Sequence, residues 1–107
     1  MGVKVESPRG FVVVAEGVSE TLAREASAKI ETVLEQSGVT AGDIENLRRR
    51  YQELGESGVD IQRLDAADLK RYSIDSNHAK ANKAIFAVLS ATKKKAPSGG
   101  VIGFRGI

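Results

Sequence analysis

The chain has 107 residues, of which 41% are apolar and 28% charged; this balance fits one folded domain and excludes a disordered polypeptide. Cysteine is absent, so disulfides and thiolate metal sites are excluded. The formal net charge of +2 hides an uneven distribution: residues 1–75 carry ten basic and fourteen acidic side chains, a net charge of −4, whereas residues 76–107 carry six basic side chains and no acidic one, a net charge of +6.

The chain opens with a predicted β-hairpin. Residues 3–6 and 11–15 flank Ser-Pro-Arg-Gly, which places Pro8 and Gly10 at the second and fourth positions of a type I turn. The second arm, Phe-Val-Val-Val-Ala, is continuously apolar instead of alternating. Such a run is typical of a strand that is covered on both faces, or of one that lies against a partner.

A first helix is predicted to follow the hairpin. Ser19 is a good N-cap, and the helix runs to about Ser37, where Gly38 is placed to stop it. Its apolar face repeats at helical spacing, and its exposed face is acidic because Glu31 and Glu35 have no basic residue at the favourable spacing.

Two shorter helices come next. Thr40 and Asp43 form a capping-box-like start for the second helix, which should end at Gly55 or Gly58. A similar opening at residues 65–68 predicts a third, short helix.

The last helix should begin after Asp75 or Ser76 and continue to about Lys94. Its apolar arc lies opposite a lysine face, and lysines near its C-terminus complement the helix dipole. Residues 96–100 break the helix, and residues 101–107 form a candidate strand that needs a partner. The hairpin edge offers one within the chain, and a neighbouring subunit offers another.

These elements predict an α+β fold in a single domain, residues 1–107. The hairpin occupies residues 1–16, a core of three or four helices residues 19–95, and a Gly-rich tail or strand residues 96–107.

The leading functional hypothesis is a non-enzymatic assembly or interaction protein that associates with itself. It rests on the apolar extended segments and on the acidic first and basic last helices, which could lie side by side within one chain or between subunits. Head-to-tail contacts of this kind would build rings or filaments. The residues assigned to self-association are Phe11, Val12, Val13, Val14, Val101, Ile102, Phe104 and Ile107.

A nucleic-acid-binding module is the alternative. Clustered cationic side chains could neutralise phosphates or bind an acidic protein partner, although the few aromatic residues give little support for base stacking. A solvated charged face explains the same pattern. The residues assigned to this surface are Arg48, Arg49, Arg50, Lys80, Lys83, Lys93, Lys94, Lys95 and Arg105.

A small nuclease or toxin built on the sole histidine is the third hypothesis. His78 falls on the apolar arc of the last helix, in its first turn, with Asp75 and Tyr72 near it in sequence. It could act as a general acid or base, but one histidine without a paired motif carries little specificity. A partly buried residue with local hydrogen-bond partners is the structural alternative, so catalysis is not favoured.

No metal-ligand spacing, cofactor motif or membrane-spanning run is found in the sequence. The start of the chain lacks the apolar stretch of a secretory signal. We therefore expect no metal, no cofactor and no membrane span, with cytoplasmic residence as the default.

Overall fold

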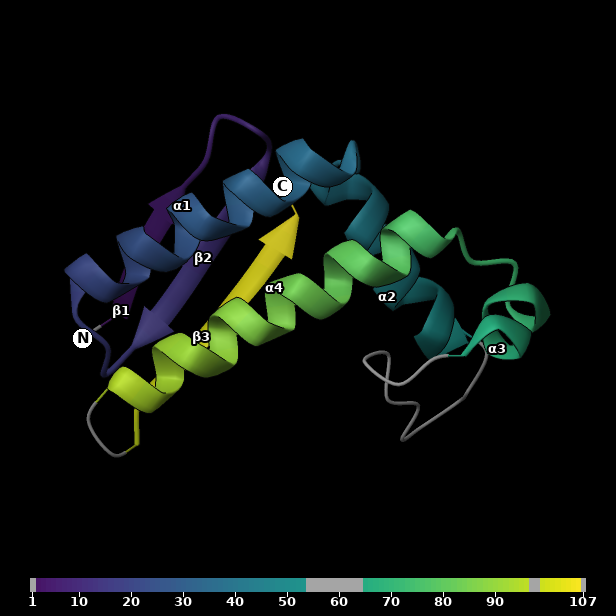
Figure 1. Ribbon diagram of the computed structural model, residues 1–107. Coiled ribbons are helices and arrows are strands. Elements are labelled where there is room, and N and C mark those ends of the chain that lie inside the picture. Colours follow the sequence, from purple (N-terminus) through teal and green to yellow (C-terminus); the bar gives the residue numbers. More distant parts are fainter. Residues whose placement is uncertain (1, 54–64, 97–98, 107) are drawn as a thin grey trace.

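The computed structural model describes residues 2–53, 65–96 and 99–106, except for the side chains of residues 51–53 and 106. Within these residues it confirms the predicted α+β class, with a hairpin, four helices and a C-terminal strand (Figure 1). The predicted end of the second helix at Gly55 or Gly58, and residue Ile107, lie outside the described residues. In chain order the elements are β1 (Gly2–Glu6), β2 (Phe11–Glu16), α1 (Glu20–Ser37), α2 (Ala41–Glu53), α3 (Ala66–Arg71), α4 (Ser76–Lys95) and β3 (Val101–Gly106).

The hairpin turn forms at the predicted residues. The Gly10 amide donates to the Ser7 carbonyl at 3.2 Å, and the Ser7 amide donates to the Phe11 carbonyl at 2.9 Å. Gly10 has φ of +90°, a backbone conformation that favours glycine. This combination of a tight turn with a left-handed glycine after it sets the register of β1 against β2.

The C-terminal strand pairs with the hairpin of its own chain. The sheet has the order β1-β2-β3, and both pairings are antiparallel. Val13 is the central example, because it lies opposite Val5 on one side and Phe104 on the other. The tail therefore packs in cis, and β2 is the central strand.

Helices α1 and α4 lie side by side and cover one face of this sheet (Figure 1). Burial along β2 alternates: Phe11, Val13 and Ala15 are buried, whereas Val12 and Val14 are only half-buried. Among the described residues, the continuous apolar run of β2 is thus fully covered on one face only. The core between helices and sheet includes Phe11, Val13, Ala23, Ile30, Leu34, Ile44, Ile85, Leu89 and Phe104.

Local capping explains where the helices begin and end. The Ser19 hydroxyl accepts from the Leu22 amide at 3.3 Å at the start of α1, and Gly38 ends that helix in the left-handed conformation. Asp75 caps α4 by accepting from the Asn77 amide at 2.7 Å. Among the described residues, no helix combines the length and the apolar character that crossing a membrane requires.

The acidic side chains of α1 do not pair with the lysines of α4. Glu31 accepts a hydrogen bond from the Ser7 hydroxyl, and Glu35 forms an ion pair of 3.4 Å with Arg9. Both partners belong to the β1-β2 turn. The two helices are therefore neighbours within one chain, but apolar contacts hold them together and their charged faces remain in solvent.

Candidate functional site

The face of the sheet that α1 and α4 leave uncovered is the first candidate, and we call it the outer face. The strand register sorts its residues into three rows that run across β1, β2 and β3. The first row is Gly2, Glu16 and Val101; the second is Lys4, Val14 and Gly103; the third is Glu6, Val12 and Arg105.

The middle of the outer face is apolar and hollowed. Val12 and Val14 are half-buried, and 60% of the Val101 surface is exposed. A shallow hollow of about 430 Å³ lies over Val14. Gly103 contributes no side chain to this hollow, and a Cβ atom added there would make ordinary van der Waals contact with a Val14 methyl group at 3.5 Å. The residues that line the hollow are Gly2, Val3, Lys4, Val14, Ala15, Glu16, Val101 and Gly103.

Charged side chains surround this apolar centre. Glu6 and Arg105 flank Val12 in the third row, and Lys4 and Glu16 lie on the neighbouring rows. All four are exposed, and none has an ion-pair partner among the residues that the structure describes. The outer face therefore combines an apolar patch with exposed charges of both signs.

The residues that the sequence assigned to self-association divide between the two faces of the sheet. Val12, Val14 and Val101 lie on the outer face. Phe11, Val13 and Phe104 are buried in the core, where the Phe11 and Phe104 ring centroids stand 5.2 Å apart. Ile102 packs against the same core, and Ile107 lies outside the described residues. Sequence alone could not assign faces because the run in β2 does not alternate.

The side chain of Arg48 is partly buried and contacts other elements of the fold. Its guanidinium carbon lies 5.3 Å from the Phe86 ring centroid and 5.1 Å from that of Phe104. Its Nη1 donates to the Phe104 carbonyl at 2.9 Å, and burial lowers the pKa of the group while Glu45 opposes that shift. The helical spacing from Ile44 to Arg48 is the signal that could have placed Arg48 on the inward side of α2.

The remaining cationic residues point in several directions. Arg49 is exposed on α2, whereas Arg50 lines a cleft between α2 and α4. Arg105 lies on the outer face of the sheet, which is the side away from α4. The exposed lysines of α4 are Lys80, Lys83, Lys93, Lys94 and Lys95. The structure does not gather the arginine run, the α4 lysines and Arg105 onto one surface.

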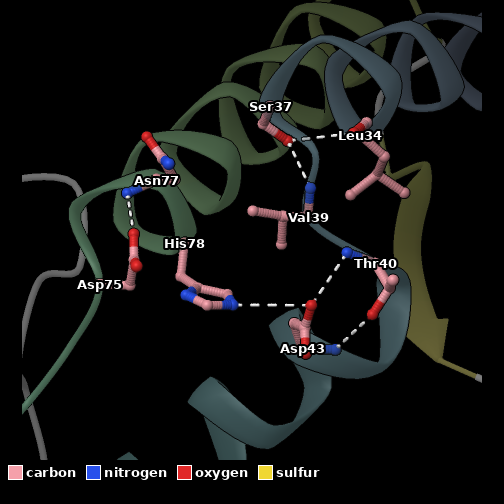
Figure 2. A network of polar contacts seen from close by, with 8 residues as sticks. All are labelled: Leu34, Ser37, Val39, Thr40, Asp43, Asp75, Asn77 and His78. Carbon is pink, nitrogen blue, oxygen red and sulfur yellow. Dashed lines mark hydrogen bonds and ion pairs between the residues drawn. The ribbon is translucent and has the colours of Figure 1, made fainter.

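His78 lies beside Asp43, a contact that the sequence did not predict. The imidazole Nε2 lies 3.6 Å from the Asp43 Oδ2 (Figure 2), and 31% of the His78 side chain is exposed. Both residues line a cleft of about 260 Å³ between α2 and α4. The other residues that line this cleft are Asn46, Leu47, Arg50, Ser73, Ile74 and Asp75.

The carboxylates that line this cleft, Asp43 and Asp75, accept hydrogen bonds at the starts of α2 and α4. Asp43 Oδ2 accepts from the Thr40 amide and the Thr40 hydroxyl accepts from the Asp43 amide, both at 3.1 Å (Figure 2). Hydrogen bonding of Thr40 to the carboxylate, first from its backbone amide, is the main reason that the pKa of Asp43 lies below its ordinary value, and His78 contributes less. Asp75 caps α4, so both described carboxylates that line the cleft accept hydrogen bonds from a main-chain amide at the start of a helix.

Within residues 2–53, 65–96 and 99–106, no three His, Asp or Glu side chains are grouped so that they could hold a metal ion. Comparison with known proteins shows no family model, no curated protein and no solved structure that matches this chain.

Proposed function

We propose that this protein is a non-enzymatic assembly module that associates with a second copy of itself through the outer face of its sheet. The observation that supports the proposal is the apolar patch of the outer face, which is formed by Val12 and Val14 on the central strand and by exposed Val101 on β3. A sheet buries its apolar face against another layer, and α1 and α4 occupy only one face of this one. Stacking a second sheet at about 10 Å would cover the other.

Charge favours a second copy as the partner. A strongly acidic or strongly basic partner would require a surface of the opposite charge. The outer face instead carries two acidic and two basic side chains. Such a mixed surface is complementary to another mixed surface. A copy of the same chain supplies one with the same size and the same apolar centre.

The small size of the face predicts weak association. Three strands of five or six residues, about 4.8 Å apart, bury less than the standard interface between stable partners. We therefore expect a concentration-dependent equilibrium instead of a permanent oligomer.

Sedimentation equilibrium on the full chain tests the proposal. Concentrations should reach about 1 mM, where a binding free energy of about 4 kcal/mol already half-forms a complex. The variant Val14→Lys places a charge at the centre of the outer face and should leave a monomer. Ala28→Lys adds the same charge on the exposed side of α1 and should leave the association intact.

A salt series and added nucleic acid distinguish the alternatives. Self-association through an apolar centre should persist in moderate salt, whereas binding to DNA or RNA should weaken steeply as salt rises. A strict monomer at every concentration and salt level would remove the proposal. Binding of nucleic acid by a monomer would favour the basic-surface alternative.

A further inference from the structure

We infer that the two copies stack as a closed dimer whose two-fold axis runs parallel to β2, so that Glu6 of each copy faces Arg105 of the other. This inference rests on the proposed self-association and adds its symmetry and its pairing. It predicts a dimer that cannot grow, because the same face is used on both copies.

The third row of the outer face supports this pairing of Glu6 with Arg105. Glu6 and Arg105 lie on β1 and β3, on either side of Val12. Two strand spacings of about 4.8 Å separate them, and no ion pair between them is formed within the chain. A rotation by 180° about an axis parallel to β2 exchanges β1 with β3 and leaves each row in place. Each Glu6 then stands over Arg105 of the second copy, and the contact forms twice.

The sizes of the side chains on the outer face also favour the axis parallel to β2. The first row ends in Gly2 on β1 and in Val101 on β3, so the rotation sets the exposed Val101 of one copy over Gly2 of the other. The second row likewise sets Lys4 over Gly103, the position at which the hollow of about 430 Å³ is open. In the first and second rows, large side chains on the outer strands thus meet glycines, which favours close packing of two sheets.

The competing axis runs across the strands. It would exchange the first and third rows, setting Lys4 over Lys4 and Arg105 over Val101. Glu16 distinguishes the two arrangements. With the axis parallel to β2, Glu16 faces Glu16 of the second copy, which is a repulsive contact; with the axis across the strands, Glu16 faces Val12 beside the Arg105 of the second copy.

A charge-swap series tests the pairing by sedimentation equilibrium. Glu6→Arg and Arg105→Glu should each weaken the dimer by about tenfold or more, since each creates two like-charge contacts. The double variant Glu6→Arg/Arg105→Glu should return to within about threefold of the wild-type dissociation constant. Glu25→Arg makes the same charge change on the exposed side of α1 and should have little effect. Glu16→Gln should tighten the dimer.

The outcomes separate this inference from the proposed function. Loss of association in Val14→Lys without recovery in the double variant would overturn the two-fold pairing and leave self-association standing. Weaker association in Glu16→Gln would also overturn it, in favour of the axis across the strands. Masses that grow beyond a dimer would contradict closure, and a monomeric wild-type protein would overturn both proposals. Circular dichroism on every variant shows that the fold is retained.

Discussion

Arg48 on α2 donates a hydrogen bond of 2.9 Å to the main-chain carbonyl of Phe104 on β3, across 56 positions of sequence. Its guanidinium also lies against the rings of Phe86 on α4 and of Phe104 itself. One side chain therefore joins α2 and α4 to β3, an edge strand of the sheet (Figure 1). Because edge strands expose main-chain groups that could pair with other chains, this contact also protects the edge.

Replacement of Arg48 should therefore destabilise the fold. Arg48→Ala removes a hydrogen bond from a charged donor and two cation-π contacts, and we expect a loss of about 2 kcal/mol in the free energy of unfolding. Urea denaturation measures it. Arg49→Ala is the matched control, because Arg49 is exposed on the same helix and should change stability by less than about 0.5 kcal/mol. Equal effects of the two variants would contradict the structural role of Arg48.

Asn82 is a fully buried residue of α4 whose side-chain nitrogen and oxygen have no hydrogen-bond partner among the residues that the structure describes. An unpaired buried amide costs about 1–3 kcal/mol, so Asn82→Leu, which keeps the number and branching of the side-chain heavy atoms, should raise the free energy of unfolding by that order. Thr92→Val is the control, since buried Thr92 donates to the Val88 carbonyl at 2.9 Å and should show no such gain. A clear loss of stability in Asn82→Leu, measured by thermal or urea unfolding, would argue against this account.

Ser73 follows α3 with φ of +54°, in the left-handed region where glycine is preferred. Its amide donates to the Lys70 carbonyl at 3.1 Å, and the Ile74 amide donates to the Leu69 carbonyl at 2.8 Å, which together close the helix end. Ser73→Gly should stabilise the protein by about 1 kcal/mol because glycine adopts this backbone conformation without strain. Ser90→Gly, in the exposed interior of α4, should destabilise by a similar amount. Melting temperatures that move in the same direction for both variants would refute the prediction.

The Asp43 cap predicts how stability depends on acid. Hydrogen bonds from Thr40, and to a lesser degree His78, hold the pKa of Asp43 below its ordinary value of 3.8. A carboxylate with a lowered pKa stabilises the folded state above its unfolded pKa, and this contribution is lost as pH falls through the folded pKa. The stability difference between wild type and Asp43→Asn should therefore be full at pH 6 and should shrink below about pH 4. Urea titrations across that range measure it, and a difference that does not change with pH would contradict the role of the cap.

His78 offers a second comparison at the same cap. Because Thr40 is the larger cause of the Asp43 shift, Thr40→Val should reduce the acid dependence more than His78→Gln does. The opposite order, read from the same urea titrations, would mean that the contact between His78 and Asp43 dominates the cleft.

Local chemistry in the sequence determined much of this protein. The Ser-Pro-Arg-Gly turn, the caps at Ser19 and Asp75 and the stop at Gly38 are all decided by residues within a few positions of one another. Turn and cap signals depend on short-range hydrogen bonds and backbone preferences, and so the α+β class and the helix starts could be predicted from them.

Tertiary structure alone decided which face of each element is covered. The register of β2 with β3 sends Val13 into the core and Val14 outward, although the two residues are identical and adjacent. Packing also directs Arg48, one of three consecutive arginines, toward the carbonyl of Phe104. It places His78 beside Asp43, 35 positions away in the sequence. These outcomes depend on long-range contacts between segments whose local patterns fit more than one neighbour, and only the assembled core selects among them.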